Sequence, residues 1–308
     1  MITGYNSVAT SKNIPNISVI IPTINEEESI GDVVSQLKAE LKDYKYEIIV
    51  VDRSIDKTPQ IAKSKGAIVL QQEKKGYGNA LLQGFSAAKG DIIVMMDGDN
   101  TYDPKDIRSL ISPILKGEAD IVLGNRFARM EKGAMTSLNK IGNKILTFLT
   151  NFLIGANVAD SQTGYRAMLK KAIFDMNLYE EHMPFATEMI FEAKREGLLI
   201  KNVPISYRIR KGKTKLNSLR DGVDIILTSL RLIRDYNPLL VFGSTGFILV
   251  VVGFYFGMET INYFNQTGVV YVGRALLSVS LSVIGILSIF TGLILDSIKS
   301  YLSKNYYK

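Results

Sequence analysis

Two long runs without a charged residue divide this 308-residue chain into parts of different character. The first extends from Leu239 to Met258 and the second from Ala275 to Leu295. A helix needs about 20 apolar residues to cross a bilayer. Two soluble core helices with no charge on any face are a poor alternative. The runs therefore predict two transmembrane helices, at about 239–261 and 275–295.

Basic residues flank the outer ends of this pair, whereas residues 262–273 between the runs contain no Lys or Arg. The flanking residues are Arg231, Arg234, Lys299, Lys304 and Lys308. By the positive-inside rule, the pair forms a hairpin over 237–298 with both chain termini in the cytoplasm. We therefore expect an integral membrane protein with a basic cytoplasmic tail over 299–308. Residues 1–16 form a polar extension without the apolar core of a signal peptide.

Between residues 17 and 236, short apolar runs rich in β-branched residues alternate with stretches whose apolar residues recur at helical spacing. Strands are expected over 17–21, 47–51, 67–70, 91–96, 119–123 and 199–207, with a short strand after residue 166. Helices are expected over 29–41, 57–65, 74–88, 104–116, 134–154, 185–196 and 219–236. This alternation predicts an α/β domain with a doubly wound, mostly parallel sheet.

The stretch 134–154 is strongly amphipathic, with apolar residues on one side and Lys140, Asn143 and Lys144 on the other. It fits an ordinary packed helix, and it also fits a helix that lies at a membrane surface. The pattern leaves both interpretations open.

Asp97-Gly98-Asp99 directly follows the apolar run 91–96. In open α/β sheets, ligands bind at the carboxyl ends of the strands. Two carboxylates one residue apart suit Mg²⁺ or Mn²⁺, which proteins usually share with substrate phosphates. A strand-to-helix turn in which Asp103 caps a helix starting at Pro104 explains the same residues without a metal. Spacing alone does not decide between the two.

Further polar residues follow other predicted strands, namely Pro22 to Glu26, Asp52 and Arg126. An edge that gathers acids, a divalent cation and basic groups suits a nucleoside diphosphate. Gly76 and Gly78 would permit a close backbone approach. The six-residue dinucleotide fingerprint and the GxxxxGK[ST] loop are both missing, which disfavours a dehydrogenase or a kinase.

Composition narrows the function further. The net charge of +7 suits an anionic substrate or an anionic membrane surface. The basic residues are dispersed and no nucleic-acid motif occurs, so we expect no nucleic-acid partner. With no cysteine and only His182 as histidine, the sequence excludes disulfides, cysteine chemistry and a histidine-cluster metal site.

Six motifs occur in the order found in one enzyme family. They are Val19 to Glu26, Val50-Val51-Asp52, Lys75 to Ala80, Asp97-Gly98-Asp99, Asp160 to Arg166 and Lys213 to Asn217. In these motifs residues 17–235 resemble family 2 glycosyltransferases. They most resemble the polyprenyl-phosphate sugar synthases, such as dolichyl-phosphate mannose or glucose synthase. The resemblance implies a GT-A-type cytoplasmic glycosyltransferase domain over 17–236.

The resemblance also implies a reaction, the inverting transfer of one hexose from a nucleotide sugar to a membrane-embedded dolichyl or polyprenyl phosphate, with Mg²⁺ or Mn²⁺. The nucleotide-sugar site would comprise Pro22, Ile24, Glu26, Asp52, Gly76 and Asp97. The metal would be held by Asp97 and Asp99, with Thr101 where mannose synthases carry a glutamine ligand. The catalytic residues would be Asp99, Asp160 and Gln162. The donor and acceptor phosphates would be bound by Arg126, Arg166, Arg210 and Lys215.

A phosphate monoester has its second pKa near about 6, so the acceptor is largely dianionic at neutral pH and needs little help from a base. Asp160 can therefore be an orienting group or a general base. For Arg126 and Lys215, surface ion pairs remain the alternative. Arg53 departs from the Val-Asp-Asp pattern that relatives usually carry after the second strand.

Residues 99–102 and 160–166 resemble glucose- or N-acetylglucosamine-type members of the family more than mannose synthases. This resemblance implies a UDP-sugar donor, with GDP-mannose as the alternative. A processive polysaccharide synthase is disfavoured, because its signature contains tryptophan and this chain has none. From another class, the chain could be a non-catalytic, membrane-anchored partner of a flippase or glycosylation complex. A homo-oligomer is left open.

Overall fold

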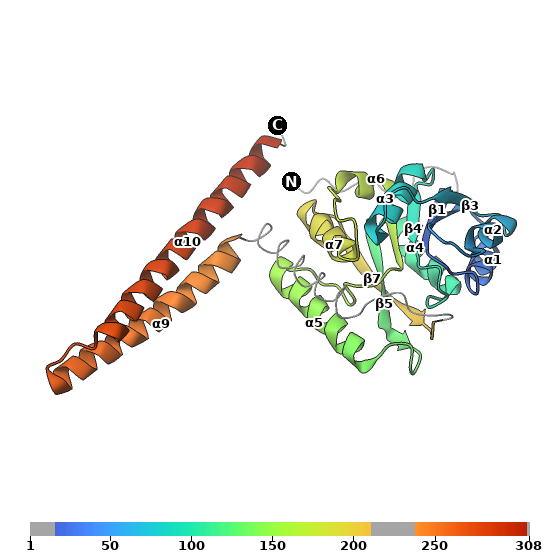
Figure 1. The fold of residues 1–308 in the computed structure, drawn as a ribbon. Helices are drawn as coiled ribbons and strands as arrows, with labels where there is room; N and C mark the ends of the chain where they lie inside the picture. Colours follow the sequence, from blue (N-terminus) through green and yellow to red (C-terminus); the bar gives the residue numbers. More distant parts are fainter. Residues whose placement is uncertain (1–15, 211–237, 307–308) are drawn as a thin grey trace. The chain divides into compact units, whose positions relative to one another are not determined.

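The computed structural model describes residues 16–210 and 238–306 (Figure 1). The chain divides into two compact units, Met1–Ser229 and Leu230–Lys308, and each is described by itself. The N-terminal extension, Lys215 and the amphipathic stretch 219–236 lie outside the described residues.

A seven-stranded sheet forms the centre of the first unit (Figure 1). Its strands are β1 (Asn16–Thr23), β2 (Lys45–Asp52), β3 (Ile68–Gln71), β4 (Ile92–Met95), β5 (Ile121–Met130), β6 (Arg166–Leu169) and β7 (Ile200–Tyr207). They lie in the order β3-β2-β1-β4-β6-β5-β7. Strand β6 is antiparallel to β4 and β5, and the other pairs are parallel. The predicted doubly wound, mostly parallel sheet is confirmed.

Helices pack on both faces of the sheet, and this explains why its strands read as nearly continuous apolar runs. The helices are α1 (Ile30–Glu40), α2 (Thr58–Ser64), α3 (Tyr77–Ala87), η2 (Pro104–Asp106), α4 (Ile107–Leu115), α5 (Ser137–Ile154), α6 (Lys170–Asp175) and α7 (Phe185–Arg195). Along β1, Val19 and Ile21 join the core cluster under α1 and α4. Ile20 points to the other face, where it packs against Gly84 of α3.

The direction of β6 determines which residues reach the functional edge of the sheet. Arg166 at its start pairs with Met95 at the end of β4. The segment that precedes β6, residues 160–165, therefore lies beside the segment that follows β4. A parallel strand would have brought the residues after it to this edge.

One predicted strand end and one unpredicted helix need correction. Gly124 to Arg126 lie inside β5 rather than beyond its end, because β5 continues to pair with β7 as far as Met130. The pairing is irregular between Asn125 and Arg129. Helix α6 was not predicted, since its six residues are too few to show a helical period.

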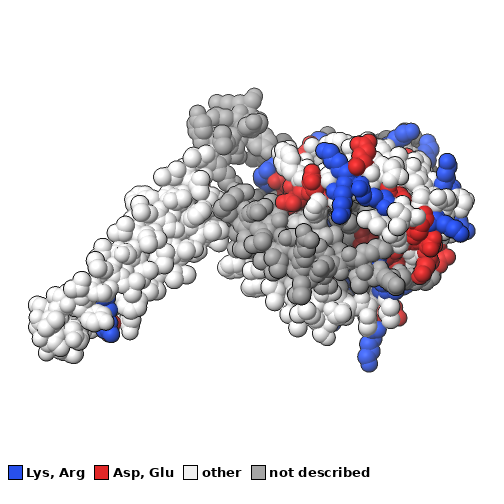
Figure 2. All heavy atoms as spheres, viewed as in Figure 1, with Lys and Arg blue, Asp and Glu red and all other residues white. Residues whose placement is uncertain are grey.

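The second unit consists of α9 (Pro238–Thr267) and α10 (Val272–Tyr306), two helices long and apolar enough to cross a membrane. Their backbones touch at Gly246, where an added Cβ would lie 2.4 Å from the Gly285 carbonyl oxygen. Ser278 also donates a hydrogen bond across to the Gly253 carbonyl, at 2.7 Å. Near the turn between them Arg274 pairs with Glu259, and Figure 2 shows charged atoms at that end of an otherwise mostly uncharged visible surface. The helices thus form the expected hairpin.

Candidate functional site

The Asp97-Gly98-Asp99 turn begins where β4 ends, and both carboxylates lie at the carboxyl edge of the sheet. Asp99 is buried, and its Oδ1 accepts hydrogen bonds from the backbone N and the hydroxyl of Thr101, at 3.0 and 2.6 Å. The Thr101 hydroxyl therefore orients Asp99. Asp103 caps η2 by accepting from the Lys105 amide, so the predicted cap and the acidic pair occur together.

Burial and the neighbouring Asp99 carboxylate raise the pKa of Asp97 to about 7. The Tyr77 hydroxyl donates to Asp97 Oδ1 at 3.2 Å and partly opposes this shift. Gly164 leaves room for the carboxylate, because a Cβ there would lie 2.9 Å from Asp97 Oδ2. Two crowded acids of this kind favour a bound cation.

Arg210 supplies positive charge to this pair. Its Nη1 lies 3.0 Å from Asp99 Oδ2 and its Nη2 lies 2.5 Å from Glu26 Oε1. The guanidinium thus joins the loop after β1 to the loop after β4. The sequence did not predict this contact, since the three residues are far apart in the chain.

The acidic pair fits a divalent cation. Within residues 16–210 and 238–306, no group of three or more His, Cys, Asp or Glu side chains could hold a metal by itself. Asp97 and Asp99 would supply two hard oxygen ligands, and Mg²⁺-type sites take their remaining ligands from substrate phosphates and water.

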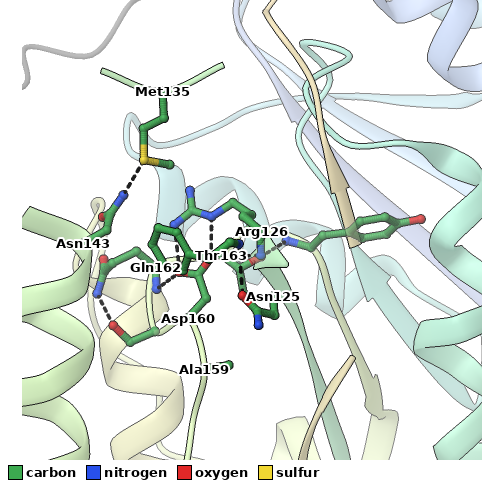
Figure 3. A network of polar contacts seen from close by, with 12 residues as sticks. Asn125, Arg126, Met135, Asn143, Ala159, Asp160, Gln162 and Thr163 are labelled. Atoms are coloured by element: carbon green, nitrogen blue, oxygen red, sulfur yellow. Dashed lines mark hydrogen bonds and ion pairs between the residues drawn. The ribbon is translucent and has the colours of Figure 1, made fainter. Parts of the chain in front are cut away.

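Arg126 and Asp160 form a bidentate ion pair that is almost completely buried (Figure 3). Arg126 Nε lies 2.6 Å from Asp160 Oδ2, and Nη2 lies 2.9 Å from Oδ1. Although burial opposes the charge, Asp160 raises the pKa of Arg126 well above its ordinary value. The Tyr207 ring lies 5.4 Å from the guanidinium carbon. Arg126 therefore belongs to a buried ion pair and not to an ion pair on the surface, which was the alternative explanation for this residue.

Both oxygens of Asp160 accept hydrogen bonds, since Oδ1 also accepts from the Gln162 amide at 3.2 Å. The Gln162 side chain donates to the hydroxyls of Ser161 and Thr187. These contacts fix the orientation of the Asp160 carboxylate. They favour the orienting role over that of a general base.

Arg166 is fully buried, which differs from the exposed position expected of a phosphate ligand. Its Nε and Nη2 donate to the carbonyls of Thr163 and Ser161, both at 2.9 Å. Burial lowers its pKa to about 10. Arg166 thus shapes the 160–165 loop from inside, and its enclosure argues against the expected contact with a phosphate.

The loops after β1 and β2 are joined by Asp52, which is also buried. Its carboxylate accepts from the Thr23 hydroxyl at 2.7 Å and from the amide and hydroxyl of Ser54. Ile24 is exposed and Pro22 is half-buried at the same edge. Asp52 therefore supports the loop that carries Ile24 and Glu26, and its enclosure argues against the direct nucleotide contact that was expected.

The close backbone approach predicted at Gly76 is to another segment of the protein and not to a ligand. A Cβ at Gly76 would lie 2.1 Å from the Glu181 carbonyl, and one at Gly78 would lie 2.0 Å from the Glu180 carbonyl. Glu188 fixes this crossing segment by accepting from the amides of Tyr179 and Glu180. The glycines are thus explained by packing, and the assignment of Gly76 to the nucleotide loses its basis.

Tyr77 belongs to the same motif and was overlooked as a site residue. It is the first residue of α3, the helix that connects β3 to β4, and its hydroxyl donates to the Asp97 carboxylate. The sequence could have indicated this role. Tyr77 lies at the start of a helix that follows one predicted strand, and such a helix start lies at the same edge of the sheet as the Asp97 turn.

With this geometry established, comparison with known proteins identifies the family. The model of glycosyl transferase family 2 matches residues 18–175, about half of the chain. The chain belongs to this family. The family resemblance inferred from the motifs is confirmed, and the protein is a glycosyltransferase.

Individual relatives match a larger part of the chain than the family model does. The low-salt glycan biosynthesis hexosyltransferase Agl6 of Haloferax volcanii is 38% identical over 80% of this glycosyltransferase and 59% of its own length. The chain thus spans less than two thirds of that relative. A dolichyl-phosphate hexose transferase of the same organism is 35% identical, with 70% of this chain and 93% of the relative covered.

Solved structures share the fold. Glucosyl-3-phosphoglycerate synthase of Mycobacterium tuberculosis, in complex with Mn²⁺, UDP-glucose and phosphoglyceric acid, superposes with a TM-score of 0.60. The two chains are 24% identical, and the match covers 71% of this chain and 80% of the other. This confirms the expected GT-A-type fold of the glycosyltransferase.

Proposed function

We propose that this glycosyltransferase transfers one hexose from a nucleotide sugar, with UDP-sugars favoured, to the phosphate of a membrane-embedded dolichyl or polyprenyl phosphate. The observation that carries the proposal is the Asp97–Asp99 pair at the carboxyl edge of the sheet, which faces the cation of Arg210. The donor preference is supported by the fold neighbour, which binds Mn²⁺ and UDP-glucose. The acceptor is supported by the dolichyl-phosphate hexose transferase among the relatives.

Asp97 and Asp99 would hold Mg²⁺ or Mn²⁺, which supplies charge neutralisation to the leaving diphosphate. Thr101 orients Asp99 instead of taking a ligand position, because its hydroxyl donates to that carboxylate. Ile24 and Pro22 offer an apolar surface for the base.

The acceptor phosphate is already ionised at neutral pH, so the protein's task is to position it in line with the leaving group. We assign the positive charge for this task to Arg126, which Asp160 holds in one orientation. Arg210 and Lys215 remain assigned to the donor and acceptor phosphates. Asp160 then acts on the acceptor through Arg126 and takes no proton.

Helix α5 connects this site with the lipid. Its exposed apolar residues lie on one stripe, comprising Leu138, Ile141, Ile145, Phe148 and Phe152. On its other face, Thr147 accepts from the Ser161 amide, and Asn151 exchanges two hydrogen bonds with Val158. We infer that α5 lies at the membrane surface and that the α9–α10 hairpin anchors the enzyme with both termini in the cytoplasm.

The test uses the full chain in detergent with dolichyl phosphate and Mn²⁺, with UDP-glucose, UDP-N-acetylglucosamine and GDP-mannose as separate donors. We expect a lipid-linked hexose from one UDP-sugar, and a loss of at least about 100-fold in rate for Asp99→Asn. Asp91→Asn, at the opposite end of the same strand, is the control and keeps the rate. Nucleotide binding without transfer to lipid from any donor would favour the non-catalytic partner instead.

A further inference from the structure

Arg210 lies between the carboxylates of Asp99 and Glu26. Its guanidinium contacts Asp99 Oδ2 at 3.0 Å, whereas Asp99 Oδ1 is already engaged by Thr101. The oxygen that Asp99 has left for an external cation is therefore the one that Arg210 holds. The Arg210 side chain is 22% exposed.

The hydrogen bonds of Arg210 are incomplete. Its Nε is buried and has no hydrogen-bond partner among the described residues. A guanidinium prefers to bind an anion through two parallel N–H donors. Here Nη1 and Nη2 bind two different carboxylates instead, those of Asp99 and Glu26. This arrangement neutralises neighbouring acids without the bidentate geometry of a stable structural pair such as Arg126–Asp160.

We propose that Arg210 is a placeholder cation, which occupies the cation-binding side of Asp99 until a divalent metal ion displaces it. The inference rests on the proposed metal role of Asp97 and Asp99. Once displaced, the guanidinium is free to bind the phosphates of the donor. Metal and nucleotide diphosphate then promote each other's binding, because each favours the state in which Arg210 has left Asp99.

The proposal makes metal binding in the absence of nucleotide the informative measurement. Removing the Arg210 charge removes the competitor, so Arg210→Gln should bind Mn²⁺ more tightly than the wild type when no nucleotide is present. An ion pair that stays in place when Mn²⁺ binds would give no gain beyond the general electrostatic effect of losing one nearby charge. The same holds for an Arg210 that serves only the donor phosphates.

Arg208→Gln is the matched control, since it removes the same charge from the same segment. Arg208 pairs with Asp103, outside the Asp97–Asp99 pair. It therefore reports the general electrostatic effect of losing one positive charge nearby.

The experiment titrates Mn²⁺ into the full-length protein in detergent and detects free Mn²⁺ by electron paramagnetic resonance, with and without UDP. We expect Arg210→Gln to bind Mn²⁺ about tenfold more tightly than the wild type without UDP, and Arg208→Gln to match the wild type. We also expect UDP to strengthen Mn²⁺ binding less in Arg210→Gln than in the wild type. As a second measurement, Mn²⁺ should raise the Tm of Arg210→Gln by more than that of the wild type.

Equal or weaker Mn²⁺ binding by Arg210→Gln, with normal binding of Mn²⁺ and UDP together by the wild type, overturns the placeholder while the proposed metal site stands. Absence of Mn²⁺ binding by the wild type even with UDP overturns both. If Arg210→Gln does not fold, Arg210→Met, which also removes the charge and keeps a long side chain, takes its place. A gain in Mn²⁺ affinity in this variant supports the proposal, and no gain contradicts it.

Discussion

Asp97 is a half-buried acid whose neighbours act on its pKa in opposite directions. Burial and the Asp99 carboxylate raise its pKa to about 7, while the Tyr77 hydroxyl stabilises its charged form. In the absence of a bound cation, the carboxyl group is therefore close to half-protonated at neutral pH. A cation must displace this proton before it can use both oxygens.

We predict that Mn²⁺ binding releases a proton from Asp97. Below pH 7 the affinity should fall by about tenfold per pH unit, because protonated Asp97 cannot act as a ligand, and above pH 8 it should be nearly constant. Calorimetry in two buffers of different ionisation enthalpy measures the release directly. About one proton is expected at pH 6 and almost none at pH 8. A release that does not change between these pH values would contradict the assignment.

The Arg126–Asp160 pair gives a second prediction at this scale. Asp160→Asn leaves the buried Arg126 charge without its partner, so it should destabilise the domain by about 3–5 kcal/mol. Urea midpoints of Asp160→Asn, Arg126→Gln and the double variant test this, and the double variant should lose less than the sum of the two. Loss of activity with unchanged stability would instead indicate that Asp160 is a general base.

At the scale of one element, α5 has two faces with different tasks. Its inner face holds the 157–161 segment through Asn151 and Thr147, and its outer face exposes the apolar stripe. An apolar stripe of this kind on an isolated helix face suits a membrane surface.

Replacing Ile141, Ile145 and Phe148 by Ser should raise the KM for a long-chain polyprenyl phosphate in liposomes by about 100-fold. Each side chain contributes roughly 1 kcal/mol or more of apolar burial to membrane contact. UDP binding should not change, because the stripe does not face the site. Ile55→Ser, which removes another exposed isoleucine, is the control. An unchanged KM in the triple variant would show that α5 does not touch the lipid.

The sequence predicted elements well where a period was long enough to read, as in β1, α1 and α7. It could not predict α6, which has only six residues, or the extension of β5, whose residues 127–130 form no continuous apolar run and are held by pairing with β7. The Asp97–Asp99 turn was found because both acids follow one strand. The enclosure of Arg166 and the contact of Arg210 with Asp99 depend on tertiary packing, which a list of charged residues does not reveal.

At the scale of the whole molecule, we expect the first unit to bind the substrates and the second unit to anchor the protein in the membrane. Deletion of residues 238–308 should leave UDP affinity unchanged, because the described site residues belong to the first unit. Transfer to a long-chain acceptor in liposomes should slow by about tenfold or more, whereas transfer to a short, water-soluble acceptor should not, since membrane anchoring raises only the local concentration of the embedded lipid. Radiolabelled product from both acceptors measures the difference. Equal rates on the long-chain acceptor would show that the hairpin is dispensable.

The reversed direction of β6 has a consequence for how such enzymes can diversify. Residues 157–165 are fixed at one end by α5 and at the other by β6, and both ends are held by backbone or buried contacts. A segment fixed in this way can be exchanged as one unit with little change to the strands beneath it, provided that the buried Arg126–Asp160 pair is kept. Under the function proposed above, such an exchange would change the acceptor side of the site and leave the half of the sheet from β1 to β4 as it is.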